Sequence, residues 1–231
     1  MKQNPYNLYR ILLEKFGGQN WWPMDKQYHK KNKSDPRFEI IIGAILTQNT
    51  AWSNVEKALN NLKSKNMLDI KKISDVDLRL LKKLIKPSGF FNQKAHRLKN
   101  MARYLHEKYD NDLDKFFNRN IREIRHELLS LNGIGPETAD SIILYAGNLP
   151  IFVVDAYTKR LCKRIPFKAG AAYDEIQQYF QKQINKKYKE NEVTPVYNEL
   201  HALIVVLAKN YCKKKPDCKK CPIKINCEYT K

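Results

Sequence analysis

Residues 37–48, RFEIIIGAILTQ, are apolar on nearly every side of a helix. Such a helix is stable only where other elements surround it, at the centre of a domain. The chain supplies those elements, because almost every periodic segment repeats its apolar residues at helical spacing. No alternating stretch is long enough for a useful strand, since IFVV (151–154) is short and follows a proline. The pattern therefore predicts an all-α fold.

Other helices are expected on the same grounds. They cover about 8–16, 52–64, 75–85, 92–108, 121–130, 136–146, 155–164, 171–187 and 196–209. Ser74, with Asp77 three residues later, is the expected cap of the helix that ends before Pro87. The lysine-rich stretch 26–33 is expected to be a solvated loop.

The chain carries a large excess of positive charge. Its 231 residues include 43 Lys and Arg against 24 Asp and Glu, a formal net charge of +19. This excess favours a polyanionic partner, either nucleic acid or an anionic membrane surface. No apolar run approaches the roughly 20 residues of a membrane span, and the polar start MKQNPYNLYR is not a signal peptide. An intracellular protein without a membrane segment is expected, acting as a monomer.

Two glycines precede an apolar helix in LLSLNGIGPETADSIILYA, residues 128–146. Pro136 suits the first position of a helix, where its missing N–H costs nothing. Gly133 and Gly135 permit a tight turn that leaves backbone amides pointing outward, beside the positive end of the helix dipole. This arrangement can bind a phosphate, although the glycines alone are better explained as a packing turn.

With Leu131 and Ile134 as apolar anchors, this segment resembles the helix-hairpin-helix of the DNA glycosylase superfamily that includes endonuclease III. The family pattern is Leu-x-Gly-Val/Ile-Gly-x-x-Thr-Ala, followed by an apolar run and an acid. FVVDAYTKRL supplies that acid as Asp155. The segments FEIIIGAILTQNT (38–50), LIKPSGFFNQKAHRL (84–98) and YNELHALIVVLAKNYC (197–212) match the family in the same order.

The resemblance implies two lobes, with double-stranded DNA that holds a damaged base bound in the cleft between them. Residues 36–149 would form a central helical barrel containing the hairpin 131–135. Residues 1–35 and 150–231 would form a terminal lobe containing a cysteine loop at 212–227.

The resemblance also assigns roles in base excision. Asp155 would stabilise the sugar cation and activate water, although it is equally suited to cap a helix. Glu137 stands where bifunctional relatives place the lysine that forms a Schiff base, which favours a monofunctional glycosylase. Gln48 would fill the space that the flipped base leaves, and Phe90 or Phe91 would be the wedge beside the orphaned base.

Four of the five cysteines lie near the end of the chain. Cys212, Cys218, Cys221 and Cys227 are spaced C-x5-C-x2-C-x5-C, which leaves zinc and an iron-sulfur cluster nearly equal choices. Endonuclease III relatives carry C-x6-C-x2-C-x5-C at this end, so the resemblance implies a structural [4Fe-4S] cluster with a first loop one residue shorter. The resemblance also implies that this loop follows the DNA backbone. Its lysines Lys213, Lys214 and Lys215 would then contact phosphate.

The three tryptophans are expected near the base pocket, together with Glu137. Trp21, Trp22 and Trp52 could stack on a positively charged alkylated purine. These segments look most like the 3-methyladenine DNA glycosylases of the endonuclease III type, which makes an alkylated purine the favoured substrate. The alternatives are an endonuclease III-type glycosylase and lyase acting on oxidised pyrimidines or mismatched thymine, and a DNA-binding relative without catalysis.

Overall fold

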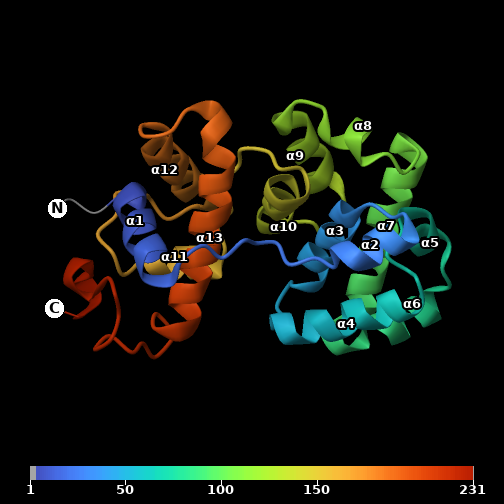
Figure 1. Cartoon of the computed structure of the whole chain (residues 1–231), viewed down its shortest axis with the longest axis horizontal. Coiled ribbons are helices and arrows are strands. Elements are labelled where there is room, and N and C mark those ends of the chain that lie inside the picture. The colour runs from blue at the N-terminus through green and yellow to red at the C-terminus, as the bar shows by residue number, and fades with distance from the viewer. Residues whose placement is uncertain (1–3, 231) are drawn as a thin grey trace. The chain divides into compact units, whose positions relative to one another are not determined.

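The computed structural model describes residues 4–230, which form helices joined by turns and no strand (Figure 1). The expected all-α fold is confirmed. The chain divides into two compact units. Unit 1 comprises Met1–Trp21 and Asn148–Lys231, and unit 2 comprises Trp22–Gly147. No helix in the described part of the chain is long and apolar enough to cross a membrane.

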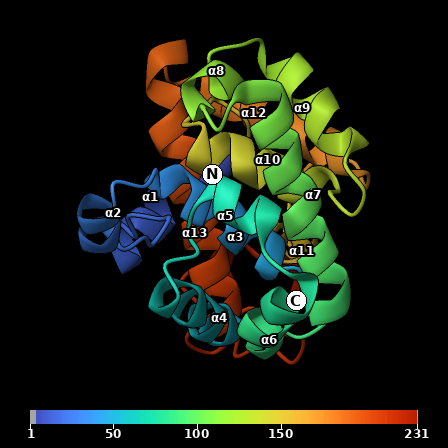
Figure 2. The same ribbon diagram turned by 90° about the vertical axis from the view of Figure 1, so that its right-hand side faces the viewer.

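Unit 2 contains the central apolar helix. Its elements are α2 (Lys26–Asn32), α3 (Pro36–Leu46), α4 (Trp52–Ser64), α5 (Ile70–Asp75), α6 (Leu78–Ile85), η1 (Lys86–Ser88), α7 (Phe91–Tyr109), α8 (Leu113–Phe117), α9 (Ile121–Ser130), α10 (Pro136–Ser141) and the π-helical turn η2 (Ile142–Ala146). Residues 38–46 of α3 are all buried. Helix α3 packs against α4, α7, α10 and η2. Figure 2 shows it among α4, α7 and α10.

Unit 1 is built around its longest helix. Its elements are α1 (Pro5–Phe16), α11 (Ala156–Cys162), α12 (Tyr173–Asn185) and α13 (Val193–Asn210), with single turns at Glu190–Glu192, Lys224–Asn226 and Glu228–Thr230. Helix α13 packs against α1, α11 and α12, so the first helix of the chain shares its core with the last three. The apolar residues 151–154 are buried without forming a strand.

Short polar side chains begin most of the helices. A side-chain oxygen of each N-cap accepts a hydrogen bond from an amide of the first turn at Asn4, Asp25, Asp35, Asp69, Asp77, Asp112, Asn120 and Asp155. The predicted cap at Ser74 is wrong. Ser74 is buried inside α5, and Asp77 itself caps α6 through the amides of Arg79 and Leu80.

Residues 22–35, expected in the terminal lobe, lie in unit 2 instead. The stretch 26–33, expected as a loop, is mostly the helix α2. One contact favours both differences: buried His29 lies 2.8 Å from a carboxylate oxygen of buried Glu39 in α3. Glu39 also pairs with Lys63 of α4 at 2.8 Å, and its other partner is the amide of Asp25. A buried carboxylate is stable only with such partners, so it ties α2 to the core of unit 2.

Candidate functional site

The hairpin of unit 2 joins α9 to α10. Gly133 adopts φ +82°, a left-handed conformation that favours glycine, whereas Gly135 is extended and begins α10 ahead of Pro136. Buried Asp140 accepts two hydrogen bonds from Arg125, at 2.7 and 3.3 Å, which fixes α10 on α9. Within residues 4–230, the amide of Gly135 donates no hydrogen bond, and its α-carbon has open space around it. The hairpin therefore presents an amide that can meet a phosphate.

An arginine braces the hairpin from behind. A β-carbon at Gly133 would lie 2.8 Å from Cγ of Arg97, so the side chain of Arg97 occupies the space that glycine leaves. Arg97 donates a hydrogen bond to Oε1 of Gln48. Nε2 of Gln48 donates to the carbonyl of Gly133 at 3.0 Å and to Oγ1 of Thr138 at 2.9 Å. Gln48 is the predicted gap-filling residue. Both Oε1 and Nε2 of its side chain are therefore already hydrogen-bonded within unit 2.

Two loops of unit 2 each contain an exposed residue whose backbone is left-handed. Asn49, the residue after Gln48, is exposed with φ +52°. Phe90 has φ +44°, and 63% of its surface is exposed. Its neighbour Phe91 begins α7 and is half-buried. Asparagine adopts this conformation readily, whereas a bulky aromatic residue rarely does, so the backbone of Phe90 marks a candidate functional position.

The tryptophans fall into two groups. Trp22 lies edge-on to Trp52, with ring centroids 5.4 Å apart, and to Tyr145, with centroids 5.0 Å apart. The indole of Trp22 rests on α3 at Gly43, where a β-carbon would come within 3.1 Å of its Nε1. Trp21 belongs to unit 1 and lies edge-on to the ring of His201, at 6.2 Å. The sequence placed the three tryptophans together, and unit 2 contains two of them together with Tyr145.

Asp155 lies at the N-terminus of α11 in unit 1, and only 8% of its surface is exposed. Its Oδ1 accepts a hydrogen bond from the amide of Thr158 at 2.7 Å, and its Oδ2 lies 3.6 Å from Nε2 of His201. Burial acts to raise the pKa of Asp155, but His201 and the Thr158 amide outweigh it and hold the pKa below its usual range. The carboxylate is therefore ionised at neutral pH, as charge stabilisation of a cation requires.

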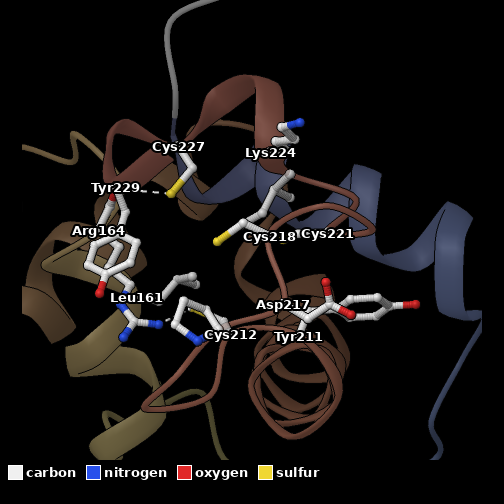
Figure 3. Close-up of a pocket in the computed structure, with 12 residues that line it drawn as sticks. Leu161, Arg164, Tyr211, Cys212, Asp217, Cys218, Cys221, Lys224, Cys227 and Tyr229 are labelled. Atoms are coloured by element: carbon white, nitrogen blue, oxygen red, sulfur yellow. Dashed lines mark hydrogen bonds between the residues drawn. The ribbon is translucent and has the colours of Figure 1, made fainter. Parts of the chain in front are cut away.

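The four terminal cysteines line one cavity in unit 1, shown in Figure 3. Apolar side chains such as Leu161 and Ile223 and the charged side chains of Arg164, Asp217 and Lys224 complete its wall. None of the four is in a disulfide. Burial raises the pKa values of Cys221 and Cys227, and the other cysteines of the set act in the same direction. Among the residues that the structure describes, no group of three or more His, Cys, Asp or Glu is arranged to hold a single metal ion.

Arg164, which follows α11, fixes the loop between the first two cysteines. Its guanidinium lies 3.2 Å from Sγ of Cys212 and donates to the carbonyls of Lys213 and Lys214 at 2.8 and 3.2 Å. The side chains of Lys213, Lys214 and Lys215 are exposed. The loop is thus held by its backbone, which leaves its lysine charges free to meet an anion. Cys162 lies outside this cavity, and burial raises its pKa to about 12.

Residues 42–186 match the family model of the HhH-GPD superfamily of base excision DNA repair proteins. The chain belongs to this superfamily. A protein of Methanocaldococcus jannaschii, named as a candidate DNA repair glycosylase, is 46% identical over 98% of this chain and 99% of its own length. Endonuclease III of Sulfolobus acidocaldarius is 28% identical over 83% of this chain and 82% of its own length. This HhH-GPD protein is therefore a DNA repair glycosylase.

Solved structures share the HhH-GPD fold. The 3-methyladenine DNA glycosylase of H. pylori, bound to 1,N6-ethenoadenine, superposes with a TM-score of 0.69 and 27% identity, over 88% of this chain and 96% of its own. An endonuclease III–DNA complex superposes with a TM-score of 0.72 and 20% identity, over 97% of this chain and 93% of its own.

Several residues of this glycosylase escaped the sequence analysis. His201, Arg97 and Tyr145 lie in helical segments whose apolar periodicity does not distinguish a site residue from a core residue. Asn49 follows the glutamine that the resemblance singled out, and only its backbone conformation and exposure set it apart. The one available signal was Gly43, a glycine inside an apolar helix, which indicates a close approach by another group.

Proposed function

We propose that this glycosylase is monofunctional and removes an alkylated purine from double-stranded DNA, using water as the nucleophile. The observation that carries the proposal is the presence of a carboxylate at two positions, Asp155 and Glu137. Asp155 is a buried, ionised carboxylate, and Glu137, in the first turn of the hairpin helix α10, is an exposed carboxylate where a lyase would have an amine. A carboxylate cannot form an imine, so the Schiff-base route through this position is closed.

Cleavage of the glycosidic bond builds positive charge on the deoxyribose. The ionised Asp155 would stabilise that charge and orient or activate the attacking water. Its position is fixed because one carboxylate oxygen caps α11 while the other faces His201. The leaving base departs more readily when it is already cationic, as a purine alkylated at N3 or N7 is, so the enzyme needs no strong general acid for such a base.

The preference for an alkylated purine rests on aromatic side chains. Trp22, Trp52 and Tyr145 form an edge-on cluster in unit 2, and electron-rich ring faces attract a cationic base. The 3-methyladenine glycosylase of H. pylori supports the same choice, because its structure contains a modified adenine.

The hairpin, the two exposed loop residues Asn49 and Phe90, and the cysteine loop would all contact the DNA. The amide of Gly135 would meet a backbone phosphate, and the lysines at 213–215 would meet others. Once the damaged base is flipped out, side chains must occupy the gap. The exposed tip Asn49 is better placed for this than Gln48, because Gln48 would first have to give up three hydrogen bonds. The exposed tip Phe90 is better placed than Phe91, because Phe91 is half-buried at the start of α7.

The cysteine set fits a [4Fe-4S] cluster held by Cys212, Cys218, Cys221 and Cys227. A cluster of this kind takes one thiolate at each of four irons, so its ligands surround a cavity, whereas zinc draws four sulfurs to about 2.3 Å of one point. The four cysteines line one cavity of unit 1, which supports the cluster. The bound cluster would hold the lysine-bearing loop in shape, and the excision chemistry does not pass through it.

An excision assay tests the function. Purified protein is incubated with duplexes that contain 3-methyladenine, 1,N6-ethenoadenine, 8-oxoguanine, an oxidised pyrimidine or a G·T mismatch, with Asp155→Asn as the matched inactive control. We expect release of the alkylated or etheno-purine by the wild type alone. Preferential release of an oxidised pyrimidine or of mismatched thymine would overturn the substrate assignment, and no release from any duplex would indicate a DNA-binding protein without turnover.

A further inference from the structure

Lys94 is among the largest fully buried side chains of the protein, with no exposed surface. It lies in the first turn of α7, directly after the loop that ends at Phe90. A buried ammonium is costly unless every N–H has an acceptor. Lys94 meets that condition, because its Nζ donates to the carbonyl of Leu46 at 2.7 Å, to Oγ1 of Thr50 at 2.8 Å and to the carbonyl of Ser88 at 2.8 Å.

These three acceptors come from the two loops that carry the exposed tips. Leu46 and Thr50 flank the loop of Asn49, and Ser88 lies two residues before Phe90. Thr50 closes the arrangement, since its hydroxyl also donates to the carbonyl of Ser88. Lys94 and Thr50 thus form a hydrogen-bonded bracket beneath both tips, within unit 2 alone.

The same bonds exclude Lys94 from covalent chemistry. Burial, with a smaller contribution from the charge of Arg97, lowers the pKa of Lys94 to about 8, a value that would suit a nucleophilic amine. However, Nζ has no exposure, and all three of its N–H groups are directed to protein oxygens. An attack on a sugar would require the two loops to separate first.

We propose that Lys94 is a positioning residue that couples Asn49 to Phe90, so that both tips enter the DNA as one rigid unit. The inference rests on the proposed base-excision function and adds a residue that never touches DNA. Removal of either side chain should then lose most of the DNA affinity that the two contribute together, because the remaining one loses its partner in the gap. Without the bracket, the tips should act independently.

A double-mutant cycle measures this coupling. Asn49→Gly and Phe90→Gly delete the side chains at positions where glycine suits the left-handed backbone, which avoids the strain that alanine would bring. The readout is the dissociation constant for a duplex with a tetrahydrofuran abasic analogue, compared with undamaged duplex at fixed salt. In the wild-type background we expect each substitution to weaken abasic binding about tenfold, and the pair to weaken it little more than either alone.

The cycle is then repeated in Lys94→Met and in the matched control Lys99→Met. Lys99 lies on the same helix and also donates to a loop carbonyl, but that carbonyl belongs to Val76. We expect the two effects to become multiplicative in Lys94→Met and to stay coupled in Lys99→Met. Lys94→Arg keeps the charge and the donors, so it should restore part of the coupling. Thr50→Val removes the bridging hydroxyl while leaving Lys94 intact, and serves as the test if Lys94→Met does not fold.

Coupling that survives in folded Lys94→Met, or in Thr50→Val where that variant is the test, would overturn the bracket while leaving the glycosylase function intact. A uniform loss of stability with unchanged coupling has the same meaning, because it assigns Lys94 a purely structural role. If instead the wild type shows no preference for the abasic duplex, the gap-filling role proposed for the tips fails first.

Discussion

The two hairpin glycines should respond in opposite ways to the same methyl group. In Gly133→Ala, the left-handed backbone costs an L-residue about 1–2 kcal/mol. The new β-carbon also displaces Arg97, which donates to Gln48, and a lost hydrogen bond adds about 1 kcal/mol. The sum of about 2–3 kcal/mol corresponds to a fall in Tm of about 5–10 °C for a chain of this size.

Gly135→Ala should leave the fold almost unchanged. Its backbone is extended, and nothing lies within 4 Å of the added β-carbon, so the free energy of unfolding should stay within about 0.5 kcal/mol of the wild type. The methyl group instead occupies the approach of a phosphate to the hairpin amide. Loss of one charge-assisted hydrogen bond should weaken DNA binding about tenfold, for lesion and undamaged duplex alike.

Thermal unfolding by circular dichroism and fluorescence anisotropy with labelled duplexes at one salt concentration measure both effects. The contrast between the variants is the test, because each serves as the other's control. Unchanged DNA affinity in Gly135→Ala would show that the hairpin is only a packing turn. A Gly133→Ala variant as stable as the wild type would refute the conformational argument.

Three further predictions concern the chemistry. Asp155→Asn should lower excision by about 10²-fold or more while DNA binding persists, because asparagine keeps the helix cap but carries no charge. A single-turnover assay that finds excision unchanged would remove Asp155 from catalysis. Wild-type product should be an intact abasic strand that breaks only with alkali or heat, since Glu137 cannot form an imine, and an adduct trapped with borohydride would contradict the water mechanism. Purified protein should be brown and contain about four irons per chain by metal analysis, whereas colourless protein with one zinc would identify a zinc site.

The fold was predictable from the sequence because its signals are local. The apolar run of α3 requires a surrounding shell, and the hairpin glycines punctuate two helices with clear patterns. The short helix α2 was missed because its lysines look solvated, while the contact that stabilises it joins His29 to Glu39 across ten residues. Ser74 and Asp77 are both sound caps by composition, and only packing decides between them.

The candidate site was predictable in its residue types and less so in its assignments. The resemblance named a gap-filling glutamine, but the hydrogen bonds that Gln48 makes to Gly133 and Thr138 depend on segments about 85 residues away. The proposal of Phe90 over Phe91 as the wedge rests on a backbone dihedral angle and an exposed fraction. The side chains of neighbouring loop residues can be of the same type and still point in different directions, so one sequence alone does not separate them.

Unit 1 takes its first helix from the start of the chain and its remaining helices from the end, with all of unit 2 encoded between them. During synthesis, which proceeds at about 5–20 residues per second, unit 2 is therefore complete while α1 still has no partner to pack against. The four cysteines proposed to hold the cluster emerge later still, after α13. Iron loading of the proposed cluster would then follow the folding of unit 2, and a chain that stops before Cys212 would have the hairpin and Asp155 but lack the proposed cofactor site.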